Sequence, residues 1–353
     1  MRLDGEYLPG WSFTNVTSQK KNFVKYWGPE ISTHCNATAG GPRKEWQEDV
    51  FDGEYREGAT VGVIPHSIYH PRPPEYNPMK QDPLHKALAD ATFRAYREAA
   101  IRLPHDVLRV IEKAAAAETN PVARGEFANI LKNIEIAERL GVPMCQDTGV
   151  PVIYLTLPPD LPLTQSFYDS VAEGVRRATK EVPLRPNVVD PLTRHNSNDN
   201  TGRGMPAIHV RPGAKFTVTV LPKGAGAENM SRTAMLLPSQ VDQIEKFVVE
   251  TVYLAGPRPC PPLVIGLGIG STFDGAAALA KEALLEPIDT MTEYEQQILA
   301  AVNRLGIGVM GLGGDTTALA VKVKTAGCHT ACLPVAVNTQ CWANRHVTIE
   351  VKR

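Results

Sequence analysis

From about Asp82 to Gly141, apolar side chains recur with the spacing of amphipathic helices. The first predicted helix presents one apolar face, made of Leu84, Leu88, Ala91, Ala95 and Ala99. A second helix begins after Pro104, and a third begins at Asn120-Pro121, an N-cap residue followed by a proline in the first turn. The third helix ends at Gly141, the residue type that most often follows a helix. The pattern therefore predicts three consecutive helices.

After Gly141 the pattern changes to a mixture of strands and helices. Runs of β-branched and apolar residues predict strands near residues 150–155, 206–211, 215–221, 263–266, 317–324, 332–338 and 346–351. Helical spacing predicts further helices near residues 163–179, 239–256, 273–285 and 292–305, the second of them capped by Ser239. A helical N-terminal part followed by a mixed sheet region predicts an α+β (mixed α/β) fold.

Residues 1–80 differ from the rest of the chain. They are rich in Gly, Pro, Trp and Tyr, they show no strong helical period, and they end in a proline-rich stretch near residues 71–78. This composition predicts an irregular extension that lies over the main body or over a partner subunit, and a partly disordered arm is the alternative. Residues 81–353 are predicted to form one domain.

The composition excludes several classes of function. The chain has 353 residues, of which 43% are hydrophobic and 21% charged, as in an ordinary globular protein. A net charge of -1 argues against nucleic acid or an anionic membrane as the main partner, because both require a basic excess. No apolar run approaches the ~20 residues of a membrane span, and the N-terminus lacks an apolar signal segment. The six cysteines are therefore expected to stay reduced, in the cytoplasm.

Three of those cysteines lie in three different predicted loops, where their neighbours are polar residues or prolines. Cys145 begins a Cys-Gln-Asp-Thr-Gly loop, Cys260 lies among prolines, and Cys341 follows a predicted strand. Three thiolates that converge on an iron–sulfur cluster leave one iron open, and an open iron is a Lewis acid rather than an electron carrier. The plainer alternative at each position is a free buried cysteine or a turn that contains one.

Other residues are weaker candidates. Arg185 lies in a predicted turn, where its guanidinium suits a substrate carboxylate and a surface ion pair is the alternative. His329 stands alone, and a lone histidine is more often a structural residue. Cys328 and Cys332 have an i, i+4 spacing that would suit zinc on a helix, but the apolar strand that follows favours core packing.

Three glycine-rich segments also need an interpretation. Residues 266–270 read Gly-x-Gly-x-Gly and not Gly-x-Gly-x-x-Gly, which argues against dinucleotide binding. Residues 223–229 and 311–317 are able to present backbone N–H groups to an anion, for which a dicarboxylate fits as well as a phosphate.

Together these motifs resemble the class I, iron–sulfur fumarate hydratase family, which includes the α subunit of L(+)-tartrate dehydratase. The similar blocks occur in order from about residue 83 to the C-terminus, at residues 133–149, 188–201, 222–229 and 311–341. The resemblance implies a hydro-lyase catalytic domain over residues 81–353 that hydrates and dehydrates a small dicarboxylate, fumarate and malate. The alternatives are L(+)-tartrate dehydration and a noncatalytic, cluster-binding regulatory subunit.

The resemblance also implies roles for particular residues. It implies a [4Fe-4S] cluster with one iron not ligated by cysteine, held in loops by Cys145, Cys260 and Cys341. It implies substrate contacts from Gln146, Arg185 and Gly226. It implies catalytic roles for Asp147, Thr148 and His329, with Asp147 as the general acid and base. These polar residues favour an enzyme over a regulatory subunit, because a scaffold needs only the cysteines.

The sequence departs from the family in two informative ways. It ends at Arg353, where single-chain members continue into a second domain, so the resemblance implies a separate β subunit that completes the active site in a homo- or hetero-oligomer. Residues 202–205 (Gly-Arg-Gly-Met) form an insertion that favours a hydroxy-dicarboxylate such as tartrate.

Overall fold

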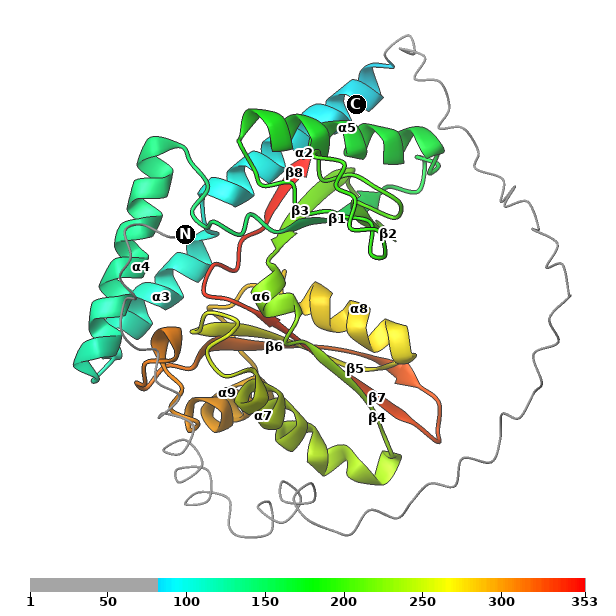
Figure 1. Cartoon of the computed structure of the whole chain (residues 1–353). Coiled ribbons are helices and arrows are strands. Elements are labelled where there is room, and N and C mark those ends of the chain that lie inside the picture. The colour runs from blue at the N-terminus through cyan, green and yellow to red at the C-terminus, as the bar shows by residue number, and fades with distance from the viewer. Residues whose placement is uncertain (1–81, 353) are drawn as a thin grey trace, which may run out of the picture. The chain divides into compact units, whose positions relative to one another are not determined.

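A computed structural model describes residues 82–352, which lie within one compact unit of the chain that begins at Lys80. The extension expected over residues 1–80 falls outside the described residues (Figure 1).

The three helices predicted at the start of the described region are present. They are α2 (Pro83–Ile101), α3 (His105–Ala117) and α4 (Pro121–Leu140). Asp82 caps α2 by accepting from the Leu84 N–H at 3.0 Å, and Asn120 caps α4 by accepting from Val122 and Ala123. Gly141 ends α4 in the left-handed conformation, with φ of 66°, which a residue without a side chain adopts at little cost.

A four-stranded sheet, here called the first sheet, follows in the order β2-β1-β3-β8. Its strands are β1 (Val150–Leu157), β2 (Ala207–Pro212), β3 (Thr217–Lys223) and β8 (Val347–Glu350). β1 pairs parallel with β2 and antiparallel with β3, which also pairs antiparallel with β8. Helices α2 and α5 (Gln165–Glu181) pack together beside it (Figure 1), and their apolar faces share one core with its strands.

The second sheet has the order β4-β7-β5-β6. Its strands are β4 (Arg232–Leu236), β5 (Leu263–Ser271), β6 (Ala318–Cys328) and β7 (Leu333–Gln340). Only β5 and β6 pair parallel. Helix α8 (Phe273–Ala283) covers one face, and α7 (Ile244–Ala255) and α9 (Glu293–Asn303) cover the other (Figure 1). Short helical turns at α6 (Ala225–Glu228), η3 (Pro238–Gln243) and η4 (Val309–Gly311) complete the described elements.

The α+β fold expected from the sequence is confirmed, and three local differences have physical causes. Strand β4 and the single turn α6 were not predicted, since both are too short to show a period. Ser239 lies in the 3-10 turn η3 and does not cap α7, which begins at Ile244. The strand predicted at 263–266 runs on to Ser271 through the glycine-rich segment.

The glycines of β5 allow α8 to approach the second sheet closely. A Cβ atom added at Gly266 would stand 1.9 Å from the Ala280 carbonyl oxygen, and one at Gly268 would stand 2.0 Å from that of Ala276. The segment is thus a strand packed beneath a helix. This packing accounts for its glycines.

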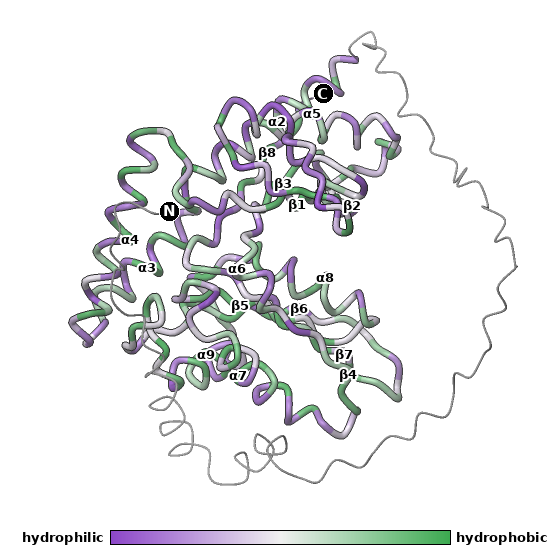
Figure 2. Tube along the Cα trace, viewed as in Figure 1, coloured by the Kyte–Doolittle hydropathy of each residue, from purple (hydrophilic) through white to green (hydrophobic). Residues whose placement is uncertain are grey.

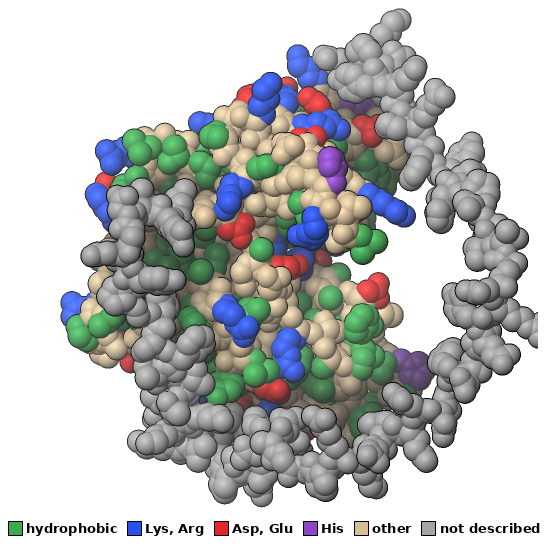
Figure 3. Space-filling model, in the orientation of Figure 1, with side chains coloured by type: hydrophobic (Ala, Val, Ile, Leu, Met, Phe, Trp, Pro, Cys, Tyr) green, Lys and Arg blue, Asp and Glu red, His purple; other side chains and the backbone are tan. Residues whose placement is uncertain are grey.

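The hydropathy of the chain follows these layers. Figure 2 shows hydrophobic stretches along the strands of both sheets and hydrophilic stretches in many connecting loops. On the face in Figure 3, Lys and Arg side chains are interspersed with Asp and Glu. Among the helices of residues 82–352, none is long and apolar enough to span a membrane.

Candidate active site

The pairing of β5 with β7 brings two of the three candidate cysteines to one end of the second sheet. Val264 lies opposite Gln340 in this antiparallel pair. Cys260 therefore precedes β5 at the same end at which Cys341 follows β7. The two loops also touch, because the Trp342 N–H donates to the Cys260 carbonyl at 3.4 Å. Both cysteines are free thiols.

Cys145 packs against the same apolar core cluster as Cys341. Burial of the Cys260 thiol is the main cause of the rise in the pKa of Cys260. The negative charges of Cys145 and Asp147 add to this rise. Burial likewise raises the pKa of Cys341, with Arg345 opposing the rise and Cys145 adding to it. Thus the loop after α4, the loop before β5 and the loop after β7 bring three thiols into one region.

The three cysteines offer free thiols, the ligand type that iron–sulfur clusters take. Within residues 82–352, no three His, Cys, Asp or Glu side chains are grouped closely enough to hold one metal ion. An iron–sulfur cluster is wider than an ion and takes thiolate sulfur, so its ligands stand further apart. Cys145 and Cys341 also pack against an apolar core, which limits the access of water.

The Cys145 loop is held at both ends. Asn133 of α4 donates through Nδ2 to the Met144 carbonyl at 2.8 Å, and the Met144 N–H donates to the Ala100 carbonyl at the end of α2 at 3.0 Å. On the other side of Cys145, the Arg345 guanidinium donates to the Asp147 carbonyl at 2.6 Å. These contacts fix the backbone on which Cys145 stands.

The Asp147 carboxylate joins three loops. Oδ1 accepts from the Gly149 N–H at 2.9 Å and from Asn187 Nδ2 at 3.4 Å. Oδ2 accepts from the Ala225 N–H at 2.7 Å, at the start of α6. Asp147 therefore ties the cysteine loop to the turn around residue 187 and to the glycine-rich segment 223–229.

Thr148 holds the backbone of Arg185. The Thr148 hydroxyl is buried and accepts from the Arg185 N–H at 3.0 Å. The buried Asn200 donates through Nδ2 to the Arg185 carbonyl at 2.9 Å, and its Oδ1 accepts from the Asn187 N–H at 2.7 Å. The turn is therefore anchored from two sides, while the Arg185 side chain itself is exposed.

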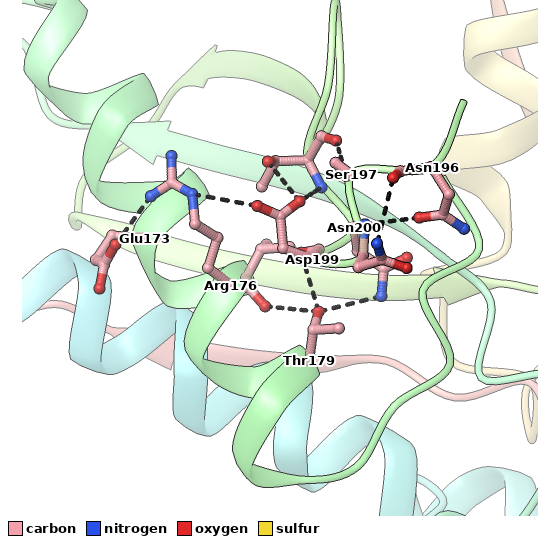
Figure 4. Close-up of polar contacts among 10 residues, drawn as sticks. Glu173, Arg176, Thr179, Asn196, Ser197, Asp199 and Asn200 are labelled. Atoms are coloured by element: carbon pink, nitrogen blue, oxygen red, sulfur yellow. Dashed lines mark hydrogen bonds and ion pairs between the residues drawn. The ribbon is translucent and has the colours of Figure 1, made fainter. Parts of the chain in front are cut away.

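The loop that contains Asn200 is locked onto α5 (Figure 4). Asp199 accepts from the Thr201 N–H at 2.9 Å and lies 3.7 Å from Arg176 Nε. Burial opposes ionisation of Asp199, but hydrogen bonds from Ser197 and Thr201 outweigh it and lower the pKa of this carboxyl. The sequence places this block near Arg185 only through the family resemblance, because no local pattern shows that Asn200 reaches back to residue 185.

The three candidate substrate residues are all exposed, and each lies on a fixed backbone. Gln146 precedes Asp147, Gly226 follows the Ala225 N–H that Asp147 binds, and Arg185 is held by Thr148. Asp147 therefore holds the segment that carries Gly226, and Thr148 holds the backbone of Arg185.

A charge cluster centred on the buried Lys223 lies at the glycine-rich segment 223–229, and no local sequence pattern predicts it. Lys223 is 1% exposed; its Nζ donates to the Thr339 carbonyl at 2.8 Å and pairs with Glu228 at 3.2 Å. Glu228 also binds Lys281 and accepts from Asn338 at 3.2 Å. Burial lowers the pKa of Lys223, and Glu228 opposes this shift. Lys223 thus joins the first sheet to β7 of the second.

His329 is not brought to the cysteines. It lies in the turn between β6 and β7, at the end of the second sheet opposite Cys341, and its Nδ1 accepts from the Ala331 N–H at 3.0 Å. Cys328 is the last residue of β6 and pairs with Ser271, so the helix that an i, i+4 zinc site would need is absent from this segment. Cys328 is exposed and Cys332 is half-buried.

The segment 311–317 does not offer a free anion site, contrary to the expectation from its glycines. Its backbone N–H groups bind a carboxylate of the same chain, since Glu118 accepts from the Asp315 N–H at 2.9 Å and from the Thr316 N–H at 3.2 Å. Asp315 in turn accepts from the Thr119 N–H at 2.9 Å. These contacts fasten the segment to the junction between α3 and α4.

Comparison with known proteins identifies relatives along most of the described region. Residues 89–350 match the family described as fumarate hydratase (Fumerase). A protein named "Putative L(+)-tartrate dehydratase subunit alpha" from Methanocaldococcus jannaschii is 44% identical over 278 residues, which cover 75% of this chain and 98% of the relative. The L(+)-tartrate dehydratase subunit alpha of Escherichia coli K12 is 31% identical over 260 residues, covering 71% of this chain and 86% of the relative.

Proposed function

From the premise that this chain belongs to the fumarate hydratase family and is a hydro-lyase, we propose that it dehydrates a four-carbon hydroxy-dicarboxylate. L(+)-tartrate is the first candidate substrate, because the relatives are named for it. The malate and fumarate pair is the second, because the family is named for fumarate. The observation that supports the proposal is that Asp147 and Thr148, in the same loop as Cys145, bind the backbone N–H groups of Ala225, next to Gly226, and of Arg185.

Cys145, Cys260 and Cys341 are the residues that would hold a [4Fe-4S] cluster. When bound, such a cluster supplies an open iron that polarises the carbon–oxygen bond of the substrate hydroxyl. The proposal rests on three free thiols from three loops, two of which touch through the Trp342 N–H.

The chain's own side chains bind and orient the substrate. The exposed Arg185 guanidinium offers paired N–H donors to one carboxylate, and its turn is fixed by Thr148 and Asn200. The Gln146 amide and the backbone at Gly226 are polar groups on neighbouring fixed loops. Such fixed donors stabilise the negative charge that develops when a proton leaves the carbon beside a carboxylate.

Asp147 is the proposed acid and base in this chain. Its carboxylate is held by the Gly149 and Ala225 N–H groups, so it stands at a constant position between the cysteine loop and the glycine-rich segment. The Thr148 hydroxyl binds the Arg185 backbone, which supports a positioning role for it beside the acid and base.

Two proposed contributions come from other chains. The relatives are named α subunits, and we propose that a β subunit completes the site. His329 lies at the end of the second sheet opposite Cys341, so a contact with the substrate would require the β6–β7 turn of a second chain.

Steady-state kinetics of the full-length chain, prepared without oxygen and mixed with a candidate β subunit, test this function. Arg185→Met is expected to lower kcat/KM for L(+)-tartrate by about 10- to 100-fold, the effect of losing a hydrogen bond to a charged group. Arg102→Met, which removes an exposed arginine paired with Glu138, is the matched control and leaves kcat/KM unchanged. Wild-type protein that turns over neither tartrate, malate nor fumarate would contradict the proposal, as would full activity of Arg185→Met.

A further inference from the structure

Arg345 is a buried cation whose hydrogen-bonding groups are only partly used. The residue is 2% exposed, and its guanidinium donates through Nη2 to the Asp147 carbonyl at 2.6 Å. Nε and Nη1 are buried and have no hydrogen-bond partner among the described residues. An unpaired buried N–H on a charged group is costly, so native proteins rarely retain one without a reason.

Lys223 differs from Arg345, because groups of the chain itself match its buried positive charge. Lys223 is 1% exposed, and its ammonium is matched by Glu228 and by the Thr339 carbonyl. Arg345 forms no ion pair of this kind within residues 82–352, and its one bond is to a neutral carbonyl. Its positive charge is thus left without a complementary anion from the described chain.

The surroundings of Arg345 indicate where such an anion would lie. Arg345 follows Cys341 by four residues, and it is close enough to that thiol to oppose the rise in the pKa of Cys341. Through Asp147 it also holds the loop of Cys145. Tyr96, another fully buried side chain whose hydroxyl lacks a partner, lies within its electrostatic reach. The unused donors of Arg345 therefore lie close to the loops of Cys145 and Cys341.

We propose that Arg345 is a positioning residue for the thiolate set, and that its free Nε–H and Nη1–H groups serve an anionic iron–sulfur cluster held by Cys145, Cys260 and Cys341. This inference rests on the proposed function. Three thiolates make a bound cluster negative, and a buried guanidinium offsets that charge. Hydrogen bonds to the sulfur atoms of a cluster stabilise it and tune its potential.

The test compares Arg345→Met and Arg345→Lys with wild type and with the surface control Arg102→Met, in the full-length chain. Each protein is reconstituted with iron and sulfide without oxygen, and the rate of iron loss to a chelator is measured. We expect Arg345→Met to lose iron about 10- to 100-fold faster than wild type, the usual effect of removing a partner of a metal ligand. Arg345→Lys keeps the charge and should retain iron better than Arg345→Met.

Thermal unfolding of the same proteins separates a cluster role from a purely structural one. In cluster-free protein, Arg345→Met loses the hydrogen bond to the Asp147 carbonyl, which destabilises the fold, but it also removes an unpaired buried charge, which stabilises it. The thermal unfolding midpoint of the cluster-free variant should therefore stay near that of wild type. In reconstituted protein its midpoint should fall below that of wild type, because ligand binding stabilises the folded state.

Three results would overturn the inference. Loss of iron from Arg345→Met at the wild-type rate would show that the residue has no part in binding the cluster. Equal destabilisation of the cluster-free and the reconstituted variant would make Arg345 a structural residue only. Wild-type protein that binds no iron would remove the proposed cluster itself, and this failure is distinguishable because it precedes any comparison of variants.

Discussion

At the scale of single residues, the polar side chains beside Cys145 both face the site and support it. Asp147 and Thr148 bind backbone groups of two other loops, and Asn200 closes the same turn from the far side. Sequence reasoning selected Asp147 and Thr148 for chemistry, and the structure adds that they fix the neighbouring loops. A substitution at either position therefore disturbs geometry as well as proton transfer.

Asn200→Ala tests this supporting network without touching a proposed catalytic group. Asn200 is fully buried and binds the Asn187 N–H, the Val188 N–H and the Arg185 carbonyl. Its loss leaves these groups unsatisfied, so the free energy of unfolding should fall by about 1–3 kcal/mol. The KM for the dicarboxylate should rise, because Arg185 loses its anchor.

Denaturant unfolding and steady-state kinetics measure the two effects. Leu192→Ala is the matched control in the same loop, since that side chain is 91% exposed and its loss should change stability by no more than about 0.5 kcal/mol. An Asn200→Ala protein with wild-type stability would show that the turn is held by other contacts.

At the scale of elements, the packing of α8 on β5 depends on glycine. Gly268→Ala would put a Cβ atom 2.0 Å from the Ala276 carbonyl oxygen, so the helix must move away from the sheet. We expect a loss of about 1–3 kcal/mol, typical of forcing extra volume into a packed core.

Gly125→Ala is the control for this prediction. Gly125 lies in α4, and a Cβ atom there would meet nothing within 4 Å. Alanine at this helical position should therefore stabilise the protein, by up to about 1 kcal/mol. Chemical denaturation of both variants measures the difference, and a Gly268→Ala protein as stable as wild type would refute the close contact.

Local patterns were sufficient to predict the long helices and most strands. The capping residues Asp82 and Asn120 and the terminating Gly141 mark helix ends by contacts within a few residues, and such signals are readable from sequence. Gly268 lies beyond the strand predicted near residues 263–266, because only the approach of α8 shows why this position lacks a side chain.

The sequence was sufficient to locate the loops of the candidate site along the chain, but not to show which loops meet. The loops of Cys145, Cys260 and Cys341 could be located from the helices and strands around them. The pairing of Val264 with Gln340 could not be predicted from the sequence. This pairing sets Cys341 beside Cys260, and it sets His329 far from both. Strand pairing between distant segments leaves little trace in one sequence, and the same is true of the contact between Glu118 and the segment 311–317.

At the scale of the whole described region, buried and half-buried charges connect the two sheets. Lys223 at the end of β3 donates to Thr339 of β7, and Arg211 of β2 bonds to Glu282 of α8 at 2.7 Å. Glu228 is the acidic centre of the first of these connections. This connection is made by Lys223 and Glu228, which belong to the glycine-rich segment 223–229 at the site.

The role of Glu228 predicts a particular dependence of stability on pH. Burial opposes its ionisation, but Lys223 and Lys281 outweigh burial and hold its pKa below the ordinary 4.5. A lowered folded-state pKa means that the contribution to stability is complete above the unfolded pKa and is lost as pH falls through the folded value.

Glu228→Gln should therefore reduce stability at pH 7, by about 1–3 kcal/mol given its partial exposure, and should flatten the loss of stability below pH 4.5. Unfolding midpoints measured between pH 3 and pH 7 test both effects, and Glu350→Gln, at an exposed pair with Lys215, is the control. Parallel curves for Glu228→Gln and wild type would remove Glu228 from the acid response.

The most direct test of the account is the iron and acid-labile sulfide content of the full-length chain after reconstitution without oxygen, for wild type, Cys260→Ala and Cys328→Ala. We expect about four iron and four sulfide per chain in wild type, as in a [4Fe-4S] protein. We expect the same content in Cys328→Ala, whose exposed thiol lies at the other end of the second sheet, and a loss of the cluster in Cys260→Ala. A wild-type chain without iron, or a Cys260→Ala chain with a full cluster, would contradict it.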